Sequence, residues 1–151
     1  MTNQNLLALI LGDEVRITQA ITTGAAWEVW MQVELVVLLL QAGLQAAREL
    51  PYPPPNSTWG LDIGAQDSQG QYAIELKVES ATNAGAALLN SVQQDIVKIA
   101  NYTPLNPGAR WVVGIGYSSQ ARGAMYAYAL SPANHAIYNE VNSIGVLIVT
   151  V

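Results

Sequence analysis

The stretch between residues 59 and 78 restricts the fold more than any other part of the chain. Apolar and polar residues alternate along it, first over 59–64 and again over 72–79. A period of two is typical of strands that bury one face. The intervening Asp67-Ser68-Gln69-Gly70 contains the residue types that favour a turn. We therefore predict an antiparallel hairpin here.

Helical spacing of apolar residues predicts helices on both sides of this hairpin. We expect four of them, over residues 3–21, 25–44, 83–101 and 119–130. Gly12 is a weak point in the first helix, and Thr23 is the expected N-cap of the second. Proline at 51 and 53–55 predicts an extended connector to the hairpin, and Pro104 and Pro107 limit the third helix.

Two further runs, over 111–117 and 144–151, are apolar and rich in β-branched residues. Such runs are typical of strands that are buried on both faces. The expected order along the chain is therefore α, α, β, β, α, β, α, β. This order predicts an α/β fold.

Composition excludes several functional classes. The chain has 151 residues, about one domain's worth, and only 11% of them are charged, so a disordered chain is excluded. No cysteine is present, which excludes thiolate-bound zinc and a cysteine nucleophile, and the single His135 excludes a histidine cluster. A net charge of -5 provides no general basic face for holding nucleic acid.

No segment has the pattern of a secretory signal or a membrane span. No Lys or Arg precedes the apolar residues near the N-terminus. The apolar stretch over 29–40 is about a dozen residues long and contains Glu34, so it is too short and too polar to span a bilayer. We expect a cytoplasmic protein without a membrane segment.

Two carboxylates and an ammonium group are expected to meet on one face of the hairpin. Glu75 and Lys77 are two residues apart and project from one face, and Asp62 on the neighbouring strand can share it. Adjacent carboxylates repel unless a cation lies between them, and a hard divalent ion meets that need. Bound Mg²⁺ activates water and polarises a phosphoryl oxygen, and a lysine can orient that water. This trio predicts hydrolysis of a phosphodiester.

The pattern of Asp62, twelve intervening residues and then Glu75-Leu76-Lys77 resembles the PD-(D/E)XK nuclease superfamily. A helix before the hairpin and an α, β, α, β succession after it extend the resemblance over about 25–151. Leu61 stands where the family has a proline. The resemblance implies a restriction-endonuclease-like α/β core with a mixed central sheet flanked by helices. Residues 1–151 would form one such domain, with 1–22 as an extra N-terminal helical extension.

The resemblance also implies an activity and a set of site residues. It implies an endonuclease that hydrolyses DNA with Mg²⁺, for which Mn²⁺ can substitute. Asp62 and Glu75 would bind the metal and Lys77 would assist the attacking water. Many members carry a glutamate on the first core helix, and Glu34 matches it as a third carboxylate ligand. Members often place a polar residue from the helix after the hairpin near the site, for which the candidates are Gln93 and Gln94.

Simpler interpretations stay open for these residues. Glu75 and Lys77 can form a surface ion pair, and Asp62 can cap a turn. Glu34 can pair with a buried arginine or lie at a subunit interface, and Glu28 is expected to be exposed to solvent. The solvent-exposed face of the third helix is expected to comprise Gln93, Gln94, Asp95 and Lys98. Lys98 is also a candidate phosphate contact. The tryptophans are expected in the core or at an interface.

Three functions are compatible with the sequence. The first is the metal-dependent nuclease. The second is a catalytically silent nuclease-like fold that serves as a binding or assembly subunit. Net acidity and the largely apolar second helix favour this alternative, because such a helix invites a homodimer or a partner subunit. The third, an α/β enzyme acting on a small phosphorylated molecule, needs a phosphate cradle that the sequence does not contain.

Overall fold

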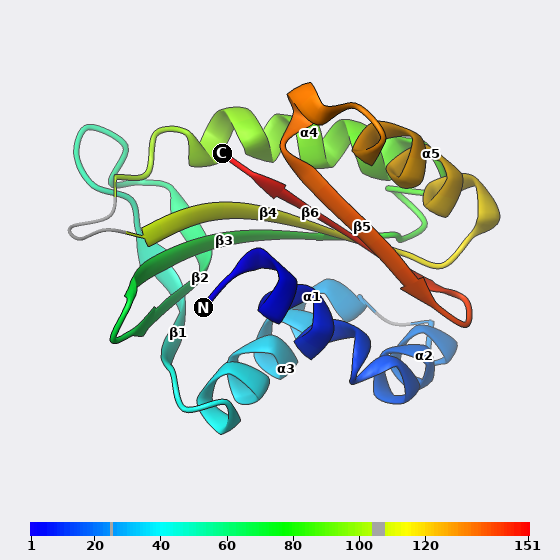
Figure 1. The fold of residues 1–151 in the computed structure, drawn as a ribbon, viewed down its shortest axis with the longest axis horizontal. Helices are drawn as coiled ribbons and strands as arrows, with labels where there is room; N and C mark the ends of the chain where they lie inside the picture. The colour runs from blue at the N-terminus through cyan, green and yellow to red at the C-terminus, as the bar shows by residue number, and fades with distance from the viewer. Residues whose placement is uncertain (25, 104–107) are drawn as a thin grey trace.

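The computed structural model describes residues 1–24, 26–103 and 108–151, and they form a mixed sheet flanked by helices (Figure 1). In chain order the elements are α1 (Asn3–Leu11), α2 (Glu14–Thr22), α3 (Trp27–Gln41), β1 (Gln45–Pro51), β2 (Gly60–Asp67), β3 (Gly70–Val78), α4 (Ala87–Ile99), β4 (Gly108–Gly116), α5 (Ser119–Ala129), the short 3₁₀ helix η1 (Pro132–Asn134), β5 (Ala136–Val141) and β6 (Ile144–Thr150). The α/β class and the mixed, helix-flanked sheet are confirmed.

The six strands lie in the order β1-β2-β3-β4-β6-β5. The first three are antiparallel neighbours, and the predicted hairpin is β2 and β3, with Asp67 paired to Gly70 at its turn. β3 and β4 are parallel, so the chain must cross over between them, and α4 makes that crossover. β4, β6 and β5 complete the sheet with antiparallel pairs.

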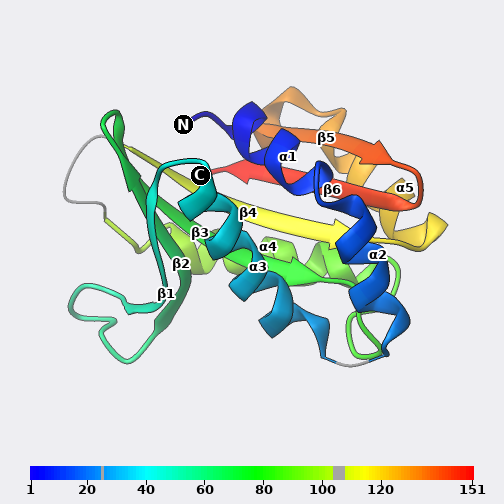
Figure 2. The same ribbon diagram turned by 90° about the horizontal axis from the view of Figure 1, so that it is seen from below.

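Helices cover both faces of the sheet. α1, α2 and α3 lie on one face, as Figure 2 shows from below, and α4 and α5 lie on the other. Ile74, Leu76 and Val78 of β3 are buried in the cluster beneath α1–α3. Glu75, the residue between two of them, contacts α4 instead. The predicted alternation of β3 is therefore confirmed.

The N-terminal region differs from the prediction of one helix over 3–21. The chain turns at Gly12-Asp13, and two helices of nine residues result. Leu6, Leu7 and Ile10 of α1 are buried against the sheet, so α1 is part of the core rather than an appendage. Thr23 is the C-cap of α2 and not an N-cap, and α3 begins after Ala26. The predicted start of that helix at Ala25 lies outside the described residues.

Two strands were not predicted. The sequence predicts no element over 45–50 and an extended connector from Pro51, but residues 45–51 form the edge strand β1 along β2. Residues 136–141 form the other edge strand, β5, along β6. Both strands are only half-buried, which weakens the apolar signal. Pro104 and Pro107, predicted to limit α4, lie outside the described residues.

Within the described ranges, no helix combines the length and apolar character needed to cross a lipid bilayer.

Candidate metal centre

β2 and β3 separate at the position of the predicted site. The register of paired residues ends at Ile63 and Ile74, although β2 begins earlier and β3 continues to Val78. Asp62 occupies the next position in β2. Its Oδ2 accepts a hydrogen bond of 2.8 Å from the backbone N–H of Leu76. The carboxylate thus satisfies a donor of β3 where the ladder between the strands stops.

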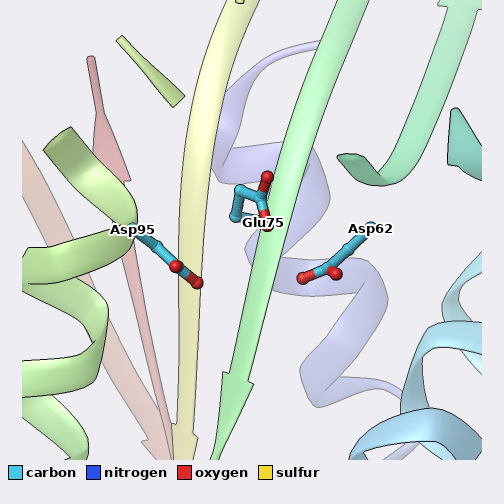
Figure 3. A group of neighbouring side chains, drawn as sticks. All are labelled: Asp62, Glu75 and Asp95. Carbon is cyan, nitrogen blue, oxygen red and sulfur yellow. The ribbon is translucent and has the colours of Figure 1, made fainter. Parts of the chain in front are cut away.

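Three carboxylates converge at this separation (Figure 3). One oxygen from each of Asp62, Glu75 and Asp95 lies within 4.8 Å of the others. They come from β2, β3 and α4 respectively, and Glu75 lies between the other two. Glu75 is fully buried and Asp95 is only 8% exposed. The predicted meeting of Asp62 and Glu75 is therefore observed, with Asp95 as an unexpected third member.

Both oxygens of Glu75 lie in a crowded polar environment. The hydroxyl of Tyr52 donates a hydrogen bond of 2.6 Å to Oε1, and Nζ of Lys98 lies 2.9 Å from the carboxylate. Lys98 also donates to the carbonyl of Gly60 at 2.9 Å. Burial, together with the negative charge of Asp62, raises the pKa of Glu75 to about 7, although Tyr52 and Lys98 oppose that rise.

Lys77 bridges two acidic side chains at the edge of the same group. Its Nζ lies 3.3 Å from Oδ2 of Asp95 and 3.4 Å from Oε1 of Glu28. Burial alone would lower the pKa of Lys77. The carboxylates of Asp95, Glu28 and Asp62 outweigh that effect and raise it. Lys77 is therefore held in its charged form beside the carboxylates.

The three carboxylates suit a small, hard divalent cation. Mg²⁺ binds oxygen ligands at about 2.1 Å, so two ligands on opposite sides of it are about 4.2 Å apart. Only one pair among three ligands can lie opposite, and adjacent ligands are about 3.0 Å apart, so oxygens within 4.8 Å of one another must draw closer to bind one ion. Oδ2 of Asp95 is buried without a hydrogen-bond partner among the described residues, although Lys77 lies near it. Burial raises the pKa of Asp95, and the charge of Lys77 opposes this.

The prediction that Glu34 belongs to the site is wrong for this structure. Glu34 is buried on α3, but its Oε2 accepts a 2.8 Å bond from Arg16 of α2. It is not in the carboxylate group found among the described residues. The alternative of an ion pair with an arginine is the arrangement observed, although Arg16 itself is largely exposed.

Glu28 is the α3 carboxylate that approaches the hairpin. It lies in the first turn of α3, six residues before Glu34, and six residues are not a whole number of helical turns. The two side chains consequently leave the helix in different directions. Besides Lys77, Glu28 contacts the backbone N–H of Val78 at 3.4 Å. The expectation of a solvent-exposed Glu28 is corrected to a half-buried residue at the site's edge.

α4 contributes Asp95 to the carboxylate group, rather than either of the predicted glutamines. Gln93 and Gln94 are exposed to solvent. Lys98, the candidate phosphate contact, has its ammonium group 2.9 Å from the carboxylate of Glu75. Asp95 was assigned to the solvent-exposed face but is buried. The sequence could have predicted this burial, because Asp95 falls on the buried stripe of the helix. The buried positions follow at intervals of four, three and four residues: Leu88, Val92, Asp95 and Ile99.

Comparisons with models of protein families, with curated proteins and with solved structures found no match.

Proposed function

We propose that this protein is a Mg²⁺-dependent nuclease with a PD-(D/E)XK-like core that hydrolyses phosphodiester bonds in DNA. One observation carries the proposal. Asp62, Glu75 and Asp95 converge where β2 and β3 separate, with the ammonium group of Lys77 beside them. Oxygen ligands for a hard cation, next to a fixed positive charge, are suited to phosphoryl chemistry.

The chain order supports the restriction-endonuclease-like core. α3 precedes the β2–β3 hairpin, and α4, β4, α5 and β6 follow it in the succession on which the resemblance rests. The sheet is mixed because α4 joins the parallel pair β3 and β4. This arrangement brings α4 over the polar face of β3, so a helix residue completes the group of carboxylates.

The residues divide into two roles. Asp62, Glu75 and Asp95 would hold the ion, which supplies an activated water and a polarised phosphoryl oxygen when it is bound. Lys77 is held charged by its acidic neighbours, so it is not available as a proton acceptor. It instead offsets negative charge that develops on the phosphate. Glu28 positions Lys77 from the α3 side.

Cleavage of plasmid DNA by the purified full chain tests the proposal. We expect cleavage with Mg²⁺ or Mn²⁺ and none with EDTA. Glu75→Gln and Lys77→Met should each reduce the rate by at least about a hundredfold, because the first removes a ligand of the ion and the second removes the positive charge beside the phosphate. Glu49→Gln, at an exposed glutamate of β1, is the matched control. Equal cleavage by all four proteins would overturn the proposal.

A silent subunit is the second candidate, and one observation favours it. The outer side of α3 exposes Val29, Val33 and Leu40, which recur at helical spacing. A row of exposed apolar side chains is typical of an interface. Calorimetric titration with Mn²⁺ separates the two functions. The nuclease predicts saturable binding that Asp95→Asn weakens, whereas a silent subunit without a metal centre predicts no binding.

A further inference from the structure

An open groove borders the carboxylates on the α4 side. Its volume is about 520 Å³, and its lining includes Trp59, Gln94, Asp95, Lys98 and Asn101. Asp95 belongs both to the groove and to the candidate metal centre. A ligand in the groove therefore lies directly beside the proposed reaction site.

Trp59 forms the aromatic end of the groove. Trp59 is 41% exposed. It is the last residue of the proline-rich loop that joins β1 to β2. The backbone N–H of Tyr52 donates to the carbonyl of Trp59 at 3.0 Å, and the two rings pack edge to face at 5.7 Å. Tyr52 in turn donates its hydroxyl to Glu75. The exposed indole is thus fixed relative to the carboxylates.

Trp59 differs from the other tryptophans in its exposure to solvent. Trp27 and Trp111 are buried, and Trp30 is half-buried. Trp59 instead presents part of its ring to a groove that also contains polar side chains. An exposed indole beside a polar site is the usual platform for a planar, unsaturated ring.

Polar groups capable of contacting a base come to the groove from α4 and from the residues just after its C-terminal end. Gln94 is exposed and carries both an amide donor and an acceptor. The amide nitrogen of Asn101 donates to the carbonyl of Val97 at 3.0 Å, which fixes its side chain. Amide side chains bind the edges of unpaired bases. Lys98, which lies between Gln94 and Asn101 in the sequence, lines the same groove and has its ammonium group on Glu75.

The charge of the chain favours stacking as the source of affinity. With 6 basic and 11 acidic residues, the protein cannot rely on neutralising many phosphates of a duplex. Stacking of a base on an aromatic ring needs no net positive charge. A paired base is already stacked within its duplex, so only an unpaired base is available to the indole.

We propose that this groove binds an unpaired nucleobase stacked on Trp59, which places a neighbouring phosphate of the same strand at the carboxylates. The inference rests on the proposed nuclease function for its substrate class. It narrows that class to single-stranded nucleic acid, or to the unpaired end or junction of a duplex.

Binding of labelled oligothymidylate to the full chain in EDTA tests this inference without cleavage. We expect Trp59→Ala to bind about tenfold more weakly and Trp59→Phe to keep most of the affinity. Tyr126→Ala, which removes a 54% exposed aromatic ring on α5, should bind like the wild type. A blunt duplex should bind more weakly than the single strand. Oligouridylate, tested in parallel, shows whether the groove also accepts ribonucleotides.

Tryptophan fluorescence gives a second readout that does not depend on the stability of Trp59→Ala. The single strand should quench the wild-type emission, and Trp59→Phe should lose that quenching while it still binds. No binding, equal affinity of Trp59→Ala and wild type, or tighter binding of the duplex would each overturn the inference. If the single strand binds as expected but no Mg²⁺-dependent cleavage occurs, only the proposed nuclease function is contradicted. If Trp59→Ala cleaves as fast as the wild type, only the proposed role of the groove is contradicted.

Discussion

The ammonium group of Lys98 lies 2.9 Å from the carboxylate of Glu75, which lies between Asp62 and Asp95. Glu75 is fully buried, whereas Lys98 is partly exposed and reaches it from α4. Lys98 thus places a positive charge against the central carboxylate of the group. Any metal ion that binds there competes with this ammonium group.

Replacement of Lys98 by Met should therefore strengthen metal binding. Removal of the competing positive charge makes the site more negative, and we expect the affinity for Mn²⁺ to rise about tenfold. Lys98→Arg keeps the charge and should bind Mn²⁺ like the wild type. Calorimetry or Mn²⁺ electron paramagnetic resonance measures both variants. Weaker binding by Lys98→Met would show that the ammonium group supports the ion rather than competes with it.

Loss of charge at Asp95 should lower the affinity for metal, whereas loss of charge at Glu34 should lower the stability of the fold. Asp95→Asn removes a ligand, and we expect Mn²⁺ affinity to fall at least about tenfold. Glu34→Gln breaks the pair with Arg16 and should lower the free energy of unfolding by about 1 kcal/mol while Mn²⁺ affinity is kept. Denaturant unfolding and metal titration of both variants test this pair. Loss of metal affinity in Glu34→Gln would restore that residue to the site.

The metal-free protein should lose stability as the pH rises toward neutrality. Burial and the charge of Asp62 raise the pKa of Glu75 from an ordinary value of 4.5 to about 7 in the folded chain, although Tyr52 and Lys98 oppose the rise. Asp95 is the other carboxylate close to it. The folded chain therefore keeps a proton that the unfolded chain releases. The contribution of Glu75 to the free energy of unfolding is largest below about pH 4.5. It decreases as the pH rises and is lost above about pH 7.

Glu75→Gln supplies the comparison for this pH dependence. A glutamine cannot release the proton, so the variant should gain stability relative to the wild type across that range. Denaturant unfolding in EDTA at several pH values measures the difference. A constant difference between the two proteins would contradict the raised pKa.

Glu79 should be important for stability but not for metal binding. Its buried carboxylate accepts hydrogen bonds from the backbone N–H groups of Gly85, Tyr117 and Ser118, at 2.8 Å each. Burial alone would raise the pKa of Glu79, but these bonds and the Ser118 hydroxyl outweigh it and lower the pKa. Its stabilising effect is therefore present above pH 4.5 and lost at lower pH.

Glu79→Gln should lower the free energy of unfolding by about 2 kcal/mol at neutral pH, because an amide cannot accept all of these bonds. The difference from the wild type should shrink on acidification. Mn²⁺ affinity should be unchanged, which calorimetry on the folded variant measures. A variant as stable as the wild type would show that the carboxylate charge is dispensable.

Local patterns in the sequence predicted the central part of the fold. The alternation along β3 is strong because its apolar residues and Glu75 lie on opposite faces, and two residues of spacing place Lys77 with Glu75. β1 was missed because its residues include Ala, Arg and Glu, which have little preference for strands. Only pairing with β2 makes it a strand, and that contact is not local.

The site was predicted only in part, because some of its residues meet through contacts that are not local in the sequence. Asp62 and Glu75 are brought together by one hairpin, so their spacing in the sequence is sufficient. Asp95 comes from α4, and its burial depends on how the crossover helix packs on β3. Glu28 and Glu34 share one helix, and only the packing of α3 decides which of them reaches the hairpin. The resemblance favoured Glu34, whereas the geometry favours Glu28.

The end of the β2–β3 pairing at Ile63 and Ile74 has a consequence for how this hairpin tolerates insertions. Five pairs of residues and a tight turn separate that point from the tip. Two residues added to each strand near the tip would lengthen the hairpin and leave both acids facing the same way. A single added residue in one strand would turn one acid to the opposite side of the sheet. Insertions near the tip therefore keep both acids on one side of the sheet when the two strands lengthen by the same number of residues.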